Sequence, residues 1–120
     1  MINPTAITLA SFTATSEGGT IAVRWVTTAE HNTWGFHLYR SADGVRAHAT
    51  RVTSDLILGR GRSQGASYSW TDTSAQAGVR YSYWLQEVET DGTTNEYGPA
   101  KSAAAPNTSG YRVFLPFAQR

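Results

Sequence analysis

The sequence contains no cysteine, which excludes disulfide bonds, thiolate metal ligands and thiol nucleophiles together. Charge is also scarce, because charged residues make up 16% of the chain, against about 25% in an average soluble protein. The net charge is +1, and no basic stripe of the kind that binds nucleic acid is present. No apolar run approaches the ~18 residues of a membrane-spanning helix. We therefore expect neither a nucleic-acid partner nor a membrane span.

The first five residues also lack the features of a secretory signal peptide, since they contain neither a positively charged segment nor an apolar core. We accordingly expect no signal peptide within this chain. The length of 120 residues fits one domain with a single core, since domains commonly run to roughly 100–150 residues.

Alternation of apolar and polar residues is the main pattern in the sequence. Gly, Asp, Asn and Ser interrupt the alternation every ~8–12 residues, which is typical of an all-β sandwich or barrel. The clearest hairpin signals are Gly18-Gly19 and Asp91-Gly92. We predict seven strands, over residues 6–15, 20–27, 35–41, 47–53, 66–71, 81–86 and 96–104. Between them, residues 56–58 are expected to tuck beneath a loop, and residues 59–63 to form an exposed, mobile tip.

The alternation also assigns a core face to the clearest strands, because successive side chains of a strand point to opposite sides of the sheet. Large apolar residues occupy every second position of three predicted strands. The predicted core residues are Ile21, Val23, Trp25, Phe36, Leu38, Tyr81, Tyr83 and Leu85.

The C-terminal region divides into a linker and an apolar tail. Residues 105–110 have the Pro, Asn, Ser and Gly content of a linker. Beyond them, four large apolar residues share one face at period two, namely Tyr111, Val113, Leu115 and Phe117. We predict a sandwich over residues 1–104 and an extra hydrophobic strand over residues 111–120. This strand is expected to pair either with its own sandwich or with a neighbouring molecule.

Several stretches carry a resemblance to a known family. They are WVTTAE at residues 25–30, GFHLYRS at 35–41, YSWTD at 68–72, GVRYSYWL at 78–85 and the Asp-Gly pair at 91–92. Together they resemble the fibronectin type III-like modules of large secreted bacterial proteins, over roughly residues 9–104. The resemblance implies an all-β fold, a seven-stranded antiparallel β-sandwich of the fibronectin type III or immunoglobulin kind. It also implies that Trp25 is the core tryptophan of the second strand, that Tyr81 forms a tyrosine corner and that Gly78 fits the turn before it.

Catalytic and metal-binding patterns are weak. The three histidines, His31, His37 and His48, suggest no site with a convincing third metal ligand. Glu30 is expected to pair with Arg40 or Arg24 at a strand end. Glu87 and Glu89 lie two residues apart and are expected to share a strand face. We interpret the chain as non-catalytic and without a cofactor or metal.

Aromatic residues carry the stronger signal, since Trp and Tyr are enriched at binding hot spots. His37, Tyr39 and Trp84 fall on the faces opposite their strands' core residues, and they are expected to form one outward patch. Such a patch suits stacking on a sugar or holding an apolar anchor of a partner. The alternative is that the tail or a neighbouring domain covers it.

These observations favour a spacer or interaction module that is extracellular or displayed at the cell surface. Its expected partner is another protein or a neighbouring domain of a larger chain. Two alternatives remain open. One is a self-assembling fibre subunit joined through residues 111–117, and the other is a carbohydrate-binding module that uses Tyr39 and Trp84.

Overall fold

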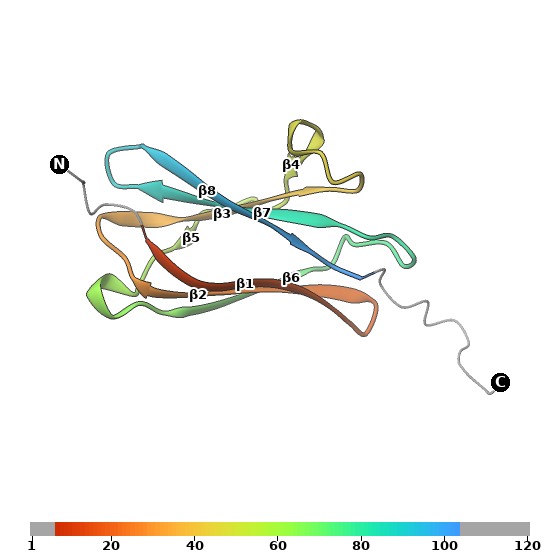
Figure 1. The fold of residues 1–120 in the computed structure, drawn as a ribbon, viewed down its shortest axis with the longest axis horizontal. Coiled ribbons are helices and arrows are strands. Elements are labelled where there is room, and N and C mark those ends of the chain that lie inside the picture. The colour runs from red at the N-terminus through yellow and green to blue at the C-terminus, as the bar shows by residue number, and fades with distance from the viewer. Residues whose placement is uncertain (1–6, 104–120) are drawn as a thin grey trace.

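Residues 7–103 are described by the computed structural model, and they form two antiparallel sheets packed as a sandwich (Figure 1). The first sheet contains β1 (Thr8–Glu17), β2 (Thr20–Ala29) and β6 (Ser67–Asp72), in the order β1-β2-β6. Each of these strands alternates exposed or half-buried side chains with more buried ones. One face of the sheet therefore covers the core and the other faces solvent.

The second sheet is built around β3 (Thr33–Ser41) and β7 (Ser82–Glu89), which pair along their whole lengths. β8 (Thr94–Lys101) lies on the far side of β7. Two short strands, β4 (Thr50–Arg51) and β5 (Ile57–Leu58), pair with β3 on its other edge. The all-β sandwich expected from the sequence is thus confirmed.

The β1–β2 hairpin turns at Gly18 and Gly19, whose φ angles are 60° and 89°. Positive φ at both central residues is the requirement of a type I′ turn, whose twist matches that of the flanking strands. The glycine pair therefore forms the predicted hairpin.

Residues 42–66 depart from the predicted pattern. In place of a strand over residues 47–53, a 3-10 helix η1 (Arg46–His48) precedes the two-residue β4. Leu58, expected beneath a loop, lies in β5 and is 62% exposed. A second 3-10 helix, η2 (Arg62–Gln64), follows. Strands as short as β4 and β5 depend on pairing with β3, which the local sequence does not encode. No helix of residues 7–103 has the length and apolar character to cross a membrane.

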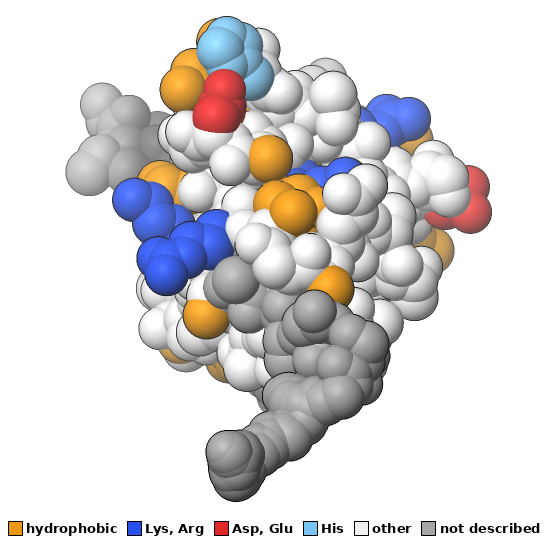
Figure 2. Space-filling model, turned by 90° about the vertical axis from the view of Figure 1, so that its right-hand side faces the viewer, with side chains coloured by type: hydrophobic (Ala, Val, Ile, Leu, Met, Phe, Trp, Pro, Cys, Tyr) orange, Lys and Arg blue, Asp and Glu red, His pale blue; other side chains and the backbone are white. Residues whose placement is uncertain are grey.

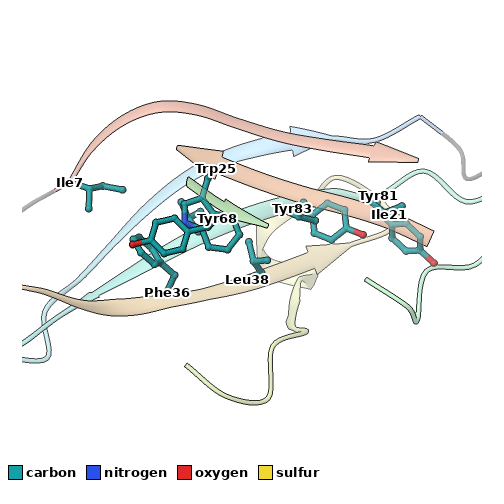
Figure 3. Packing of buried hydrophobic residues seen from close by; sticks show 10 residues of the cluster. Ile7, Ile21, Trp25, Phe36, Leu38, Tyr68, Tyr81 and Tyr83 are labelled. Carbon is teal, nitrogen blue, oxygen red and sulfur yellow. The ribbon is translucent and has the colours of Figure 1, made fainter. Parts of the chain in front are cut away.

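The core lies between the sheets and is centred on Trp25, which is fully buried (Figure 3). Its ring stacks on Tyr68 with 5.2 Å between centroids and meets Phe36 edge-on at 5.6 Å. Tyr68 comes from β6 and Phe36 from β3, so this aromatic group joins both sheets. All eight predicted core residues are buried: Ile21, Val23, Trp25, Phe36, Leu38, Tyr81, Tyr83 and Leu85.

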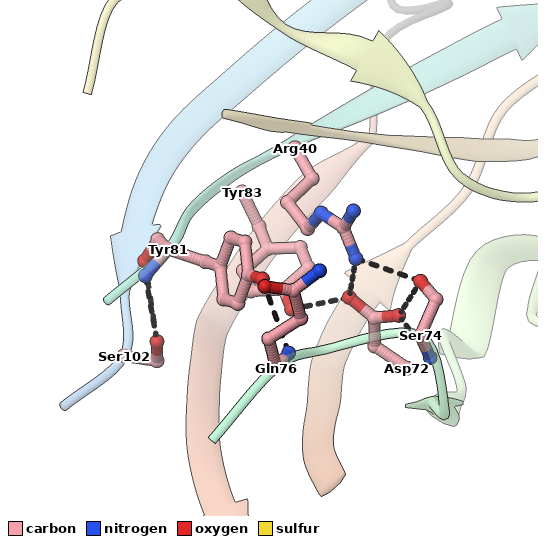
Figure 4. A network of polar contacts seen from close by, with 7 residues as sticks. All are labelled: Arg40, Asp72, Ser74, Gln76, Tyr81, Tyr83 and Ser102. Atoms are coloured by element: carbon pink, nitrogen blue, oxygen red, sulfur yellow. Dashed lines mark hydrogen bonds and ion pairs between the residues drawn. The ribbon is translucent and has the colours of Figure 1, made fainter. Parts of the chain in front are cut away.

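A polar network surrounds the buried carboxylate of Asp72, the last residue of β6 (Figure 4). Tyr83 donates its hydroxyl to Oδ2 over 2.6 Å, and Arg40 pairs with the same oxygen at 2.8 Å. Ser74 donates its N–H and hydroxyl to Oδ1 at 3.1 and 2.8 Å. Burial alone favours the neutral acid, but these hydrogen bonds hold the pKa of Asp72 below its ordinary value of 3.8. The network ties β6 to β3 and β7.

Tyr81 precedes β7 and anchors the connection from β6. Its hydroxyl accepts a hydrogen bond of 3.1 Å from the N–H of Gln76, five residues upstream. The guanidinium of Arg40 lies 4.5 Å from the centre of its ring. This is the contact expected of a tyrosine corner, in which the hydroxyl returns to the preceding backbone.

Trp25→Ala is expected to destabilise the protein by ~3–5 kcal/mol, because it removes the ring that joins both sheets. Trp25→Phe retains an aromatic ring there and is expected to cost less. Urea denaturation followed by circular dichroism measures both. An unchanged midpoint for Trp25→Ala would contradict the central position of this residue.

Tyr83→Phe is expected to cost about 1.5–3 kcal/mol, because its hydroxyl donates to a buried charge, and Tyr81→Phe about 0.5–1.5 kcal/mol. The two variants delete the same atom type on neighbouring rings, so each serves as the other's control. Unfolding free energies from urea titrations provide the comparison. A larger loss for Tyr81→Phe than for Tyr83→Phe would refute this account of the network.

Candidate binding site

The outer face of the five-stranded sheet carries the aromatic residues selected from the sequence. Tyr39 on β3 lies directly opposite Trp84 on β7, and His37 lies opposite Gln86. His37, Tyr39 and Trp84 consequently share the face turned away from the core.

An arginine covers this aromatic group. The guanidinium of Arg46, in η1, lies 4.4 Å from the ring centre of Tyr39 and 5.9 Å from that of Trp84. It also forms an ion pair of 2.7 Å with Glu96 on β8. Only 6% of Trp84 is exposed. Trp84 is therefore not the open surface residue that was expected, because an arginine of the sandwich itself lies over this aromatic group.

His37 has a structural contact at the same face. Its Nδ1 lies 2.7 Å from the hydroxyl of Thr53, which also accepts a hydrogen bond from the N–H of Leu38 at 3.1 Å. Burial, and after it the charge of Arg51, lowers the pKa of His37. The hydrogen bond between this ring and Thr53 ties the segment after β4 to β3.

Two large apolar side chains are exposed near the Thr33 end of the five-stranded sheet. Trp34 is 55% exposed and Leu58 is 62% exposed. Leu58 pairs with Gly35, and the N–H of Gly59 donates to the carbonyl of Trp34 over 2.9 Å, so the two residues are one step apart on adjacent strands. The side chain of Leu56 lies directly over Gly35, where an added Cβ would meet its Cγ at 2.7 Å. Trp34, Leu56 and Leu58 are named the apolar patch.

A β-bulge explains the exposure of Trp34. Thr33 pairs with Glu89 and Gly35 pairs with Val88, so Trp34 has no partner of its own on β7. An extra residue of this kind redirects a side chain. Strict alternation from the buried residues further along β3 would instead bury the tryptophan. Trp34 was missed because it lies just before the predicted strand over residues 35–41, and no local sequence pattern indicates the bulge.

Glu30, at the end of β2, is a buried carboxylate with 5% exposure. The hydroxyls of Tyr68 and Thr27 each donate to its Oε2 over 2.6 Å. The N–H of Gly61 donates to its Oε1 over 2.9 Å. Burial, together with the hydrogen bond to Glu30, raises the pKa of Tyr68 to about 12. The carboxylate is thus satisfied by neutral donors, as a buried polar group must be.

The expected ion pair between Glu30 and an arginine is wrong. Arg40 binds Asp72 at the opposite end of β3. Arg24 pairs with Glu17 near the β1–β2 hairpin, at 2.9 Å between exposed side chains. Both cations are therefore engaged elsewhere.

Glu30 fixes the loop that joins β5 to β6. Its own N–H donates to the carbonyl of Arg62, and Thr27 and Ala66 exchange two backbone hydrogen bonds of 2.9 and 3.1 Å. The expectation for residues 59–63 was an exposed, mobile tip. Arg60, Arg62 and Ser63 are exposed as expected, but hydrogen bonds hold the loop backbone to β2 and Glu30.

Two glycines make this close approach possible. Gly61 is buried, and a Cβ there would lie 2.7 Å from the Oε2 of Glu30. Gly65 has a φ of 75°, and a Cβ there would lie 2.0 Å from the carbonyl oxygen of Thr27. Any side chain at either position requires the loop to move away from β2.

A cleft of about 390 Å³ lies beside the loop. Its lining residues are polar apart from one glycine: Glu30, Asn32, Thr33, Gly59, Arg60 and Arg62. Within residues 7–103, the two non-glycine residues with positive φ both line it, Asn32 at 58° and Arg62 at 49°. Backbone of this kind is unfavourable for L-residues and gathers at ligand sites.

The two arginines of the cleft are held differently. The guanidinium of Arg60 lies 4.3 Å from the ring centre of Tyr68 and donates to the carbonyl of Ser67. Arg62 is exposed. The ion pairs within the described part of the chain involve other cations, so neither arginine is neutralised by a carboxylate there.

Glu87 and Glu89 share a face, as expected, and it is the inner one: they are 0% and 3% exposed. Asn95 donates to both carboxylates, at 3.1 and 2.5 Å, and Thr33 donates to Glu87 at 2.5 Å. No group of three or more His, Asp or Glu side chains among residues 7–103 is arranged to hold a metal ion. These glutamates therefore link β7 to β3 and β8 through side-chain hydrogen bonds near the end that carries the cleft.

A second cleft, of about 240 Å³, lies at the opposite end of β3, which faces the viewer in Figure 2. Its lining includes Asp43, Arg80 and Lys101. Lys and Arg side chains gather at one margin of this view. Arg80 is an exposed cation at this end of the sandwich. Val45, which is 43% exposed, follows the lining residue Gly44 in the chain and is an exposed apolar residue remote from the first cleft.

The tail residues Tyr111, Val113, Leu115 and Phe117 lie outside the described residues. Comparisons of the chain with protein-family models, curated proteins and solved structures found no match. The candidate site consists of the cleft and the apolar patch.

Gly65→Ala is expected to destabilise the protein by ~1–3 kcal/mol more than Gly78→Ala, because only Gly65 has a neighbour in the way of a Cβ. The φ angles, 75° and 82°, are nearly equal, and nothing lies within 4 Å of a Cβ at Gly78. The pair therefore separates close approach from backbone strain. Urea midpoints provide the measurement, and equal losses would mean that the loop is not packed on β2 as described.

Proposed function

We propose that this chain is a non-catalytic module of a secreted or surface-displayed protein, a spacer and interaction domain that docks a protein partner. The fibronectin type III-like resemblance of its motifs motivates the proposal. The strand order, β1-β2-β6 against β4-β3-β7-β8, supports it, as does the hydroxyl contact of Tyr81. A fold of this kind serves many functions, so its function depends on the surface that it presents.

The apolar patch is the observation on which the proposal depends. A tryptophan and a leucine that are more than half exposed lie one step apart on paired strands. Exposed apolar groups that gather in this way mark interaction sites, and tryptophan leads the residues found at binding hot spots. The leucine beside the tryptophan favours an apolar side chain of a protein over a sugar ring.

Backbone pairing also makes the patch suitable for docking. The carbonyl of Trp34 is fixed by the N–H of Gly59, and Leu58 is fixed by its pairing with Gly35. A partner therefore binds a surface whose backbone is ordered in advance, which reduces the entropy lost on association.

The two alternative functions have less support. A sugar that stacks on Tyr39 and Trp84 must first displace Arg46 and break its ion pair with Glu96. Fibre assembly through residues 111–117 depends on a segment outside the described residues. A sedimentation series over protein concentration tests the fibre directly, since assembly through this segment requires size to rise with concentration.

Trp34→Ser is expected to abolish partner binding while changing stability by less than about 0.5 kcal/mol, because the side chain is mostly exposed. Random peptides displayed on phage, selected against the full chain, provide a probe that presupposes no partner. The selected peptides are expected to bind the full chain at least ~10-fold better than Trp34→Ser.

Val45→Ser is the matched control, since Val45 is also an exposed apolar residue but lies at the other end of the sandwich. Its binding is expected to equal that of the unmodified chain. Peptides that bind all three proteins alike would contradict docking at the apolar patch. A glycan array that returns a ligand dependent on Tyr39 would favour the carbohydrate-binding alternative.

A further inference from the structure

The polar cleft and the apolar patch are built from adjoining residues of the same two segments. Thr33 lines the cleft and precedes Trp34, while Gly59 lines the cleft and follows Leu58. The N–H of Gly59 donates to the carbonyl of Trp34 and locks the two segments together. A ligand on the patch therefore lies beside residues that line the cleft.

The charge of the cleft is positive. Arg60 and Arg62 contribute two guanidinium groups, against the single carboxylate of Glu30. That carboxylate is buried and already accepts three hydrogen bonds from Thr27, Gly61 and Tyr68. It is thus turned inward, and the arginines determine what the cleft presents to solvent.

The position of Arg62 is set in advance by the loop. Its carbonyl accepts the N–H of Glu30, and its φ of 49° is maintained although arginine disfavours it. These contacts fix the backbone of Arg62, an exposed residue, at the lining of the cleft before any ligand arrives. Preorganisation of this kind improves binding by reducing the ordering cost.

We propose that the cleft binds carboxylate side chains of an acidic protein segment whose apolar side chain rests on the apolar patch. Guanidinium groups bind carboxylates through paired, charge-assisted hydrogen bonds, and the side-chain amide of Asn32 is a further donor among the lining residues. The inference rests on the proposed docking function and specifies the chemistry of the partner.

The test uses the full chain labelled with nitrogen-15 and a blocked peptide with two glutamates flanking one leucine. Addition of the peptide is expected to shift the amide signals of Thr33, Gly59 and Arg62. Arg62→Gln is expected to weaken binding by about ten-fold or more. Arg80→Gln, which removes a cation at the other cleft, is expected to change it by less than about two-fold, because salt screens charges at that distance.

A peptide with glutamines in place of the glutamates is expected to lose the shifts. The proposal is overturned if no shifts appear at about 10 mM peptide, or if Arg62→Gln and Arg80→Gln weaken binding equally. It is also overturned if a galacturonate oligosaccharide produces the shifts and the peptide does not, since the ligand is then an acidic glycan. Unchanged near-ultraviolet circular dichroism verifies that Arg62→Gln folds.

Trp34→Ser separates this proposal from the docking function on which it rests. Loss of binding with Trp34→Ser but not with Arg62→Gln leaves the docking function standing and refutes the carboxylate site. Loss with Arg62→Gln alone supports the carboxylate site and refutes docking at the apolar patch. Loss with both variants is the result expected.

Discussion

Burial of the Glu30 carboxylate without a cationic partner governs how one end of this sandwich is built. A buried charge needs several donors, and here they are two hydroxyls and one backbone N–H. These donors come from β2, from β6 and from the loop between β5 and β6. Satisfying one carboxylate therefore draws three segments together. The position of Arg62, the shape of the cleft and the place of Gly59 beside Trp34 all follow from that convergence.

The two ends of the sandwich handle buried acids differently. At one end, Asp72 forms an ion pair with Arg40, so the charge of this arginine is neutralised by a buried carboxylate. At the other end, Glu30, Glu87 and Asn95 form contacts in which hydroxyls, amides and backbone N–H groups replace cations. The arginines near that end remain available to solvent. This division explains how a chain with a net charge of only +1 presents a locally positive cleft.

The long strands and the core were predictable from the sequence, because period-two alternation directly reports which face is buried. Trp25 and Tyr81 were placed correctly on that basis together with the family resemblance. The candidate site was not predictable. Trp34 is exposed through a bulge that breaks the alternation, and the order of the loop before β6 depends on a carboxylate more than 30 residues away in sequence from the Gly61 amide that it binds. Tertiary contacts of this range leave no local pattern.

The central claim is that Glu30 holds the loop that carries the cleft. Amide hydrogen exchange in Glu30→Gln tests it most directly, with Glu17→Gln as a control because Glu17 is an exposed acid in a surface ion pair. The account predicts that the amides of Gly61 and Ala66 exchange at least ~10-fold faster in Glu30→Gln, since their local opening becomes easier, while that of Leu85 in β7 changes little. Unchanged exchange at Gly61 and Ala66, or equal acceleration in both variants, would contradict it.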